Sequence, residues 1–389
     1  MDLSNRPAAA RLSDHAESAN AARLRYVTDD APGVKRRRNG KGFVSVTTNG
    51  KIVRGQHELR RFKALAVPPA WRDVWICALP NGHLQATGRD AKGRKQYRYH
   101  PRWREFRDES KYDRMLDFAW VLPTIRRRVE HDLALPGLHR KKILATVIRL
   151  LEMSRIRIGN EEYRQQNNSH GLATLRSHHV SVSGSSIRFE FRGKSGVQHA
   201  LGLNDRRLAT IIKRCQEFPG HELFQYIGDN GDRYRINSED VNDYLRQIGG
   251  DEFSSKDFRT WAGTVLAARE LEQLDGVGTK TARKKSIQRA IELVAEKLGN
   301  TKVICRKCYI HPAVIEACLE GSLSQLLRRR TTKTKTWHGL ESEEAAVLAL
   351  LRRKRSLDKR ESESNMRKQL KKSLRARKVQ DRSRSNHRE

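Results

Sequence analysis

The chain has 389 residues, of which 79 are Lys or Arg and 45 are Asp or Glu, giving a formal net charge of +34 and a pI near 10.5. So large an excess of positive charge excludes most small-molecule enzymes and favours a polyanionic partner, because each phosphate that a cationic side chain neutralises releases counterions. Nucleic acid is therefore favoured over a membrane surface. A hydrophobic fraction of 37% is low for one globule but suffices for two modest cores with disordered ends.

The sequence carries no sign of export or membrane insertion. No apolar run approaches the roughly 18 residues of a membrane span, and the N-terminus lacks the apolar core of a signal peptide. We therefore expect a soluble, intracellular protein. The cysteines are odd in number and lie mostly within apolar patterns, so we expect reduced thiols rather than a disulfide framework. They are Cys77, Cys215, Cys305, Cys308 and Cys318.

The N-terminal quarter has the signals of β-strands. Residues 1–22 are Ala-rich and unpatterned, and we expect them to be disordered. Residues 43–46 run into the turn pair Asn49-Gly50 and out through 52–53, which predicts a hairpin. Residues 74–79 predict a second strand, which a turn at 80–82 connects to strands that continue to residue 100, and a short helix is expected over 57–65. We assign a small β-rich domain to 23–108.

From residue 109 the periodicity becomes helical. Leu144, Val147, Ile148 and Leu151 recur at the spacing of an amphipathic helix. Alternating apolar residues over 180–191, followed by the turn 193–196, predict a three-stranded β insert. Further helices are expected at 206–215, after a cap at Asn237 or Ser238, after a cap at Ser254 or Ser255, and over 287–294 up to Gly299. The fold class is therefore α+β, with a mainly α-helical second domain at 109–325.

The C-terminal extension, 326–389, is strongly basic. From residue 352 to the end, 16 Lys or Arg stand against 5 Asp or Glu, and apolar residues are sparse. Such a segment cannot bury a core, so we expect it to be largely disordered from residue 352 and to bind polyanions without specificity. We also expect a flexible break at 275–278, where the sequence reads Asp-Gly-Val-Gly.

Five side chains of the helical domain have the chemistry of phosphoryl transfer. Two guanidiniums and an amide could hold the charged oxygens of a phosphodiester under attack, a phenol can attack the phosphorus, and an ammonium can protonate the leaving oxygen. These side chains are Arg157, Arg259, Asn300, Tyr309 and Lys194. Composition and spacing alone do not select these five from so many basic residues.

A family resemblance does select them. The segments that carry it are RIGNEEY at 157–163, GLATLRSHHV at 171–180, FRGKSG at 191–196, KDFRTWAGT at 256–264 and GNTKVICRKCYIHP at 299–312. In this order they resemble the catalytic domain of type IB DNA topoisomerases of the poxvirus and bacterial branch. The segment GRDAKGRKQYRYHP at 88–101 resembles the DNA-contacting part of the family's N-terminal domain.

The resemblance implies a role for each of these residues. Tyr309 matches the nucleophile, Arg157 and Arg259 match the arginines that stabilise the transition state, and Lys194 matches the general acid. Asn300 falls where the poxvirus enzyme has a histidine, which we interpret as the bacterial variant. The implied reaction is cleavage of one strand through a 3′-phosphotyrosyl link, strand rotation and religation, without ATP, cofactor or metal.

The resemblance also implies the partner and the setting. It predicts a monomer that closes as a clamp around duplex DNA in the nucleoid-associated cytoplasm, with no membrane and no small-molecule substrate. Residues expected to contact DNA are Gln96, Tyr97, Arg98, Tyr99 and Tyr163, because Gln can read adenine in the major groove and tyrosines can meet backbone or base. For Tyr163, packing in the core is an equally good interpretation.

Three alternatives remain open. A tyrosine recombinase uses related chemistry, although it normally carries His-x-x-Arg where this chain has Lys256-x-x-Arg259 and has a helical N-terminal domain. A non-catalytic, nucleoid-compacting protein would also explain the charge. Cys305, Cys308, His311 and Cys318 invite a zinc site, but the spacing is poor for one because Tyr309 must move between them.

Overall fold

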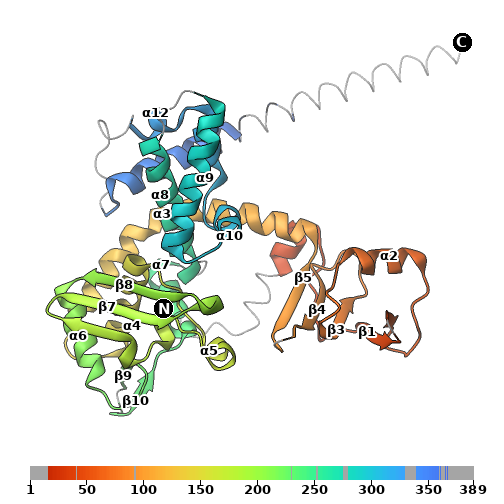
Figure 1. The fold of residues 1–389 in the computed structure, drawn as a ribbon, viewed down its shortest axis with the longest axis horizontal. Helices are drawn as coiled ribbons and strands as arrows, with labels where there is room; N and C mark the ends of the chain where they lie inside the picture. Colours follow the sequence, from red (N-terminus) through yellow and green to blue (C-terminus); the bar gives the residue numbers. More distant parts are fainter. Residues whose placement is uncertain are drawn as a thin grey trace, which may run out of the picture. The chain divides into compact units, whose positions relative to one another are not determined.

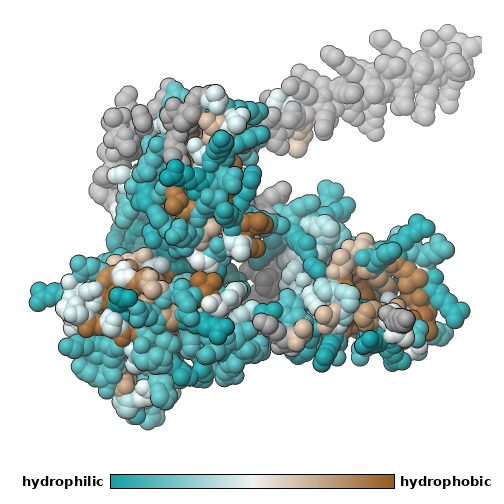
Figure 2. Space-filling model, viewed as in Figure 1, coloured by the Kyte–Doolittle hydropathy of each residue, from teal (hydrophilic) through white to brown (hydrophobic). Residues whose placement is uncertain are grey.

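The computed structural model describes residues 16–40, 42–91, 93–228, 230–250, 253–274, 279–328 and 339–358, together with residues 360, 364 and 366. The chain divides into two compact units, Met1–Asp113 and Arg114–Glu389. The division falls inside a long helix, α3 (Pro101–Ala134). Figure 1 shows the ribbon of both units, and Figure 2 shows a mainly hydrophilic surface over each, as the high content of charged residues requires.

The N-terminal unit is built on one antiparallel sheet with the strand order β2-β1-β3-β4-β5. The strands are β1 (Gly33–Asn39), β2 (Gly42–Val46), β3 (Arg72–Cys77), β4 (Leu84–Arg89) and β5 (Lys95–Tyr99). Helix α2 (Gln56–Ala64) contributes Phe62 to the core formed by Val34, Val74 and Ile76. The predicted hairpin β3-β4 and the helix near 57–65 are confirmed.

The first predicted hairpin is only partly correct. Strand β2 pairs mainly with β1, from Lys35 opposite Val46 to Asn39 opposite Gly42. Ile52 returns to Val46 through a single bridge. Strand β1 was not predicted, because its sequence GVKRRRN has one large apolar side chain, and its extended form depends on pairing with strands on both sides.

The expectation of disorder over residues 1–22 is wrong for its last part. Residues 16–21 are helical, and Ala19 and Ala22 are buried with Leu24 and Trp103 in one apolar cluster. An Ala-rich segment without periodicity can still be ordered when its small side chains fit closely against a large aromatic ring. Residues 1–15 lie outside the described residues.

The second unit is mainly helical, as predicted. After α3 its helices are α4 (Arg140–Ser154), α5 (Glu161–Asn167), α6 (Arg206–Gln216), α7 (Ser238–Gly249), α8 (Ser255–Leu274), α9 (Lys280–Leu298), α10 (Lys302–Cys308), α11 (Pro312–Glu320) and α12 (Leu323–Arg328). Two of the predicted helix ends are confirmed: Asn237 accepts hydrogen bonds from the first turn of α7, and Gly299 ends α9 with a positive φ of 57°. The predicted break at 275–278 lies outside the described residues.

The predicted β insert is confirmed as a three-stranded antiparallel sheet in the order β6-β7-β8. Its strands are β6 (Val180–Ser183), β7 (Ser186–Arg192) and β8 (Gln198–Asn204), and a short hairpin adds β9 (Gln225–Ile227) and β10 (Arg233–Arg235). Ile187, Phe189 and Phe191 alternate into the core from β7. The sheet positions the turn between β7 and β8, where Lys194 lies.

The basic C-terminal extension contains an ordered helix. Residues 342–358 are helical, and Ala346, Val347, Leu348, Leu350 and Leu351 are buried. The expectation of disorder from residue 352 is therefore wrong for 352–358, because an apolar face anchors the helix that these residues continue; most of the remaining extension lies outside the described residues. Within the described part of the chain, no helix is both long enough and apolar enough to cross a membrane.

Candidate active site

The loop that carries Arg157 is fixed by a close backbone contact. Leu172 N–H donates to the carbonyl of Arg157 at 2.9 Å. A Cβ on Gly171 would lie 2.5 Å from the Arg157 carbonyl and 2.5 Å from the Gly159 nitrogen, and Gly159 has a positive φ of 84°. The two glycines are therefore needed for this approach. The contact explains why the segments at 157–163 and 171–180 belong together.

The side chain of Arg157 reaches the end of α9. Its Nη2 donates to the Gly299 carbonyl at 3.2 Å and to Oδ1 of Asn300. The backbone N–H of Asn300 donates to Ala295 O at 2.9 Å, which closes the helix. The backbone of Asn300 therefore closes the last turn of α9 while its side chain orients Arg157.

Arg259 is buried in the second turn of α8, with a side chain only 5% exposed. Its Nη2 donates to Leu298 O at 2.6 Å, and its Nη1 donates to Arg155 O. The guanidinium carbon lies 5.3 Å from the centre of the Tyr309 ring. Burial lowers the pKa of Arg259, the nearby charge of Arg157 lowers it further, and Tyr309 opposes both. The two guanidiniums thus form a positively charged site, and a bound anion would reduce the repulsion between them.

Tyr309 is held in place through its backbone. It follows α10, and its N–H donates to Cys305 O at 2.9 Å. Its carbonyl accepts a hydrogen bond from Thr264 Oγ1 at 3.2 Å, and a Cβ on Gly263 would lie 2.6 Å from that carbonyl. Gly263 and Thr264, at the end of the KDFRTWAGT segment, therefore position the backbone of the half-buried tyrosine. Burial raises the pKa of the neighbouring Cys305 thiol to about 11, so this thiol is protonated at neutral pH.

Lys194 lies on the turn between β7 and β8. Gly193 N–H donates to Val197 O at 2.8 Å, and Ser195 adopts a positive φ of 64°. The Lys194 side chain is exposed, and its Nζ lies 5.3 Å from the centre of the Tyr163 ring. Such an exposed ammonium on a hairpin turn can reach a bound substrate.

Four of the five predicted catalytic residues line one pocket of about 490 Å³. They are Arg157, Lys194, Arg259 and Tyr309; Tyr163 and Lys256 line it too, and Asn300 is joined to it through Arg157. The named cations therefore converge on one pocket, where they could stabilise an anionic group. Tyr163 is half-buried, so its ring both packs against its neighbours and borders the pocket.

The predicted DNA contacts of the N-terminal unit lie on β5 but on two faces of it. Tyr97 is 45% exposed and stacks on Tyr99 with the ring centres 6.0 Å apart. Gln96 and Arg98 alternate to the other face, where Gln96 Nε2 donates to Asp90 and Arg98 donates to Ala66 O at 3.0 Å. The four side chains therefore do not form a single surface.

His199 is a neighbour of the site that the sequence analysis missed. Its ring stacks on Phe191 with the centres 4.9 Å apart. A Cβ on Gly193 would lie 2.5 Å from the His199 ring, and one on Gly299 would lie 3.0 Å from it. Burial lowers the pKa of His199, and the charges of the two site arginines lower it further. A histidine on a predicted strand five residues after Lys194 was the available signal.

Comparison with known proteins gives consistent matches. The family model described as "Eukaryotic DNA topoisomerase I, catalytic core" matches residues 100–336, and the one described as "Bacterial DNA topoisomerase IB, N-terminal domain" matches residues 42–90. DNA topoisomerase 1B of Acanthamoeba polyphaga mimivirus is 30% identical over 291 residues, which cover 73% of this chain and 87% of the relative. DNA topoisomerase I of Monkeypox virus is 24% identical and DNA topoisomerase 1B of Vaccinia virus (strain Copenhagen) is 23% identical, each covering 67% of this chain and 80% of the relative.

Proposed function

Since the chain belongs to the type IB DNA topoisomerases, we propose that it relaxes supercoiled duplex DNA by transient cleavage of one strand, with Tyr309 as the nucleophile. The observation that carries this proposal is the pocket in which Arg157, Lys194, Arg259 and Tyr309 meet. These residues come from separate segments of the chain. Cationic side chains without a shared role would repel one another and would not be expected to converge beside a phenol.

The chemistry follows from the position of each group. The Tyr309 oxygen attacks the scissile phosphorus, and its proton passes to solvent. The bond from phosphorus to the 5′ oxygen breaks, and Lys194 gives that oxygen a proton, so that a 5′-hydroxyl leaves and a 3′-phosphotyrosyl link remains. The phosphodiester energy is kept in the new link, so religation by the same hydroxyl needs no ATP.

The two arginines act on the non-bridging oxygens. Arg259 is anchored by two backbone carbonyls and Arg157 by Gly299 and Asn300, so both guanidiniums are fixed before DNA arrives. Fixed donors need little reorganisation as charge develops, which is the main source of their stabilising effect. Asn300 accepts from Arg157 through Oδ1 and has its Nδ2 3.4 Å from Leu298 O, a long contact that leaves the amide N–H available to the phosphate.

We propose a division of labour between the assigned domains. Residues 23–108 and 109–325 both bind the duplex as a clamp. In the first domain Tyr97 and Tyr99 would contact DNA from one face of β5 and Gln96 and Arg98 from the other, and Tyr163 would contact it from the second domain. The extension 326–389 adds affinity through its positive charge. The net charge of +34 supports such binding. The protein acts as a monomer in the nucleoid-associated cytoplasm.

Supercoiled plasmid incubated with the protein in EDTA without ATP tests the proposal. We expect full relaxation and, after rapid denaturation with SDS, protein attached covalently to a 3′ DNA end. Tyr309→Phe should bind DNA nearly as the wild type yet form no adduct, because only the attacking oxygen is removed. Persistent supercoils with folded protein would favour a nucleoid-compacting protein. Dependence on two partner DNA sites would favour a recombinase.

A further inference from the structure

The helix at 342–358 lies beyond the region that matches the catalytic-core family model, residues 100–336. It is nevertheless built into the second unit: five of its apolar side chains are buried, and Figure 1 shows it in blue beside α8. Its acidic residue Glu344 is only 7% exposed. A buried carboxylate is costly unless it is fully hydrogen-bonded, so its partners identify what the helix holds.

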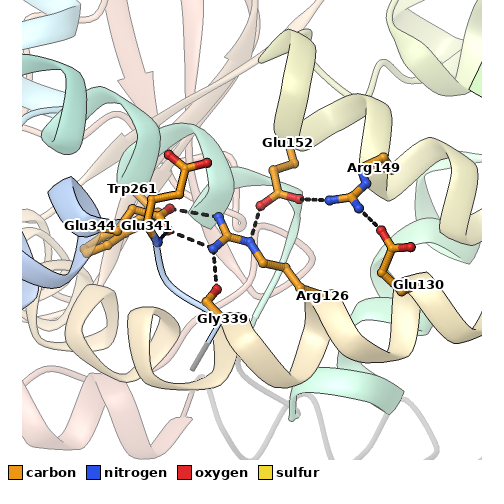
Figure 3. Close-up of polar contacts among 8 residues, drawn as sticks. All are labelled: Arg126, Glu130, Arg149, Glu152, Trp261, Gly339, Glu341 and Glu344. Carbon is orange, nitrogen blue, oxygen red and sulfur yellow. Dashed lines mark hydrogen bonds and ion pairs between the residues drawn. The ribbon is translucent and has the colours of Figure 1, made fainter. Parts of the chain in front are cut away.

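Figure 3 shows that Glu344 is fully engaged. Its Oε1 accepts from Trp261 Nε1 at 2.9 Å and from Arg126 Nη2 at 2.9 Å. Its Oε2 accepts from Arg126 Nη1 at 2.7 Å and from the Glu341 N–H at 3.0 Å. The helix is thereby joined to α3 through Arg126 and to α8 through Trp261.

Arg126 extends the network to α4. Its Nε donates to Glu152 at 2.6 Å, and Glu152 also pairs with Arg149. Burial alone would lower the pKa of Arg126, but the hydrogen bonds and charges of Glu344 and Glu152 raise it instead. Charge-assisted hydrogen bonds to the two carboxylates therefore hold the Arg126 guanidinium in place.

The far end of the helix makes two more contacts. Lys354 Nζ lies 3.0 Å from Glu316 on α11, and the Arg352 guanidinium lies 5.0 Å from the centre of the Trp120 ring on α3. The helix thus contacts α3, α8 and α11 directly and reaches α4 through Arg126. Three of these elements lead to site residues: α4 ends three residues before Arg157, α8 carries Arg259, and α11 begins three residues after Tyr309.

A cavity borders one side of α8. About 390 Å³ of space is lined by Phe258 and Trp261 of α8, by Arg155 and by the acidic residues of the C-terminal helix. Arg155 is the residue whose carbonyl accepts from Arg259, and its buried Nε has no hydrogen-bond partner among the described residues. Because this side of α8 is not filled by close packing, the hydrogen bond from Trp261 to Glu344 helps to fix the helix in place.

We propose that the helix 342–358 is a brace for the active site, and that Glu344 is a positioning residue that fixes Arg259 through Trp261, two residues away on α8. The proposal depends on the roles given above to Arg259 and Tyr309. It implies that the C-terminal extension contributes to the rate of strand cleavage as well as to DNA affinity.

Single-turnover cleavage of a saturating DNA substrate, measured with DNA affinity and thermal unfolding, tests the brace. Glu344→Ala should slow cleavage by about 10-fold to 100-fold, the range expected for losing hydrogen bonds to a charged group, with DNA affinity changed less than about twofold because Glu344 lies outside the pocket. Ser342→Ala is the control, since Ser342 is an exposed residue of the same helix that does not line the cavity, and this variant should cleave at the wild-type rate.

Trp261→Phe keeps an aromatic side chain and the ion pair of Glu344 with Arg126, but it removes the N–H that donates to Glu344 together with the five-membered ring of the indole. The lost packing of this buried side chain should lower the melting temperature, so cleavage is measured well below it, where we expect a rate several-fold slower than the wild type even if Glu344→Ala fails to fold. Cleavage by Trp261→Phe at the wild-type rate would overturn the brace while leaving the proposed function intact. Failure of the wild type to cleave would overturn the proposed function itself.

Discussion

Asn300 offers the sharpest test of the site, because it occupies the position where charge would do most harm. Its Oδ1 accepts from Arg157, and its N–H closes α9. Asn300→Ala removes a hydrogen bond to a charged donor, worth about 1.5–3 kcal/mol, and should slow strand cleavage about 10-fold to 150-fold if that bond persists in the transition state. Asn300→Asp keeps the shape but places a carboxylate on Arg157, which neutralises that arginine and repels the phosphate.

We therefore expect cleavage to be slower with Asn300→Asp than with Asn300→Ala, although the aspartate is closer in size to the native residue. The assay is single-turnover cleavage at saturating DNA, with the adduct trapped by SDS. Asn204→Asp adds the same charge at the exposed end of β8, away from the turn that carries Lys194, and should cleave normally. If Asn300→Asp cleaves as fast as the wild type, Asn300 does not orient Arg157 during the reaction.

The remaining predictions concern four other parts of the chain. Lys194→Ala should slow cleavage of ordinary DNA about 10²–10⁴-fold but be largely rescued when sulfur replaces the 5′-bridging oxygen, since a thiolate leaves without a proton; an equal defect on both substrates would mean that Lys194 stabilises phosphate charge instead. Deleting 359–389, which spares the helix at 342–358, should flatten the salt dependence of DNA binding without changing the rate of cleavage, and an unchanged slope would show that the segment does not touch phosphates. The pKa of His179 is lowered to about 4, first by burial and then by neighbouring cationic groups, so the unfolded chain binds a proton that the folded chain does not. The contribution of His179 to the free energy of unfolding should be fully present above its ordinary pKa of 6.5 and should be lost as the pH falls towards 4, by at most about 1.4 kcal/mol per pH unit. Urea unfolding of His179→Phe and the wild type at pH 7.5 and 5 measures the difference. Gly171→Ala should displace the Arg157 loop and abolish most cleavage, whereas Gly202→Ala, where a Cβ has nothing within 4 Å, should be harmless; comparable activity of the two in the same adduct assay would contradict the steric argument.

The sequence predicts elements well where a local pattern decides them. Helix α9 follows from apolar residues at helical spacing and from Gly299 at its end, and strand β7 follows from strict alternation. Strand β1 could not be found in this way, since its basic residues adopt an extended form by pairing with β2 and β3. The helix at 342–358 was missed because the charge of residues 352–389 dominated the interpretation, whereas the buried apolar residues lie just before them.

The site shows a different limit of local patterns. Arg157 and Asn300 are 143 residues apart, and no periodicity relates them. Only the family resemblance brought them together as candidates, and the structure supplies the contact. Asn300 combines a structural contact with the role proposed for it in the site. Its backbone closes the last turn of α9 and its side chain accepts a hydrogen bond from Arg157, so the end of the helix positions the Asn300 amide.

Close backbone contacts at glycines position the other residues of the pocket as well. Gly171 and Gly159 bring two backbone segments into contact, and the result is the placement of Arg157. Gly263 allows the Tyr309 carbonyl to approach α8, the helix that also carries Arg259. Because these contacts involve backbone atoms, they fix the side chains proposed to be catalytic more tightly than exchangeable surface ion pairs would. Substitutions at these glycines should therefore affect the rate of cleavage more strongly than substitutions of most of the 79 basic residues.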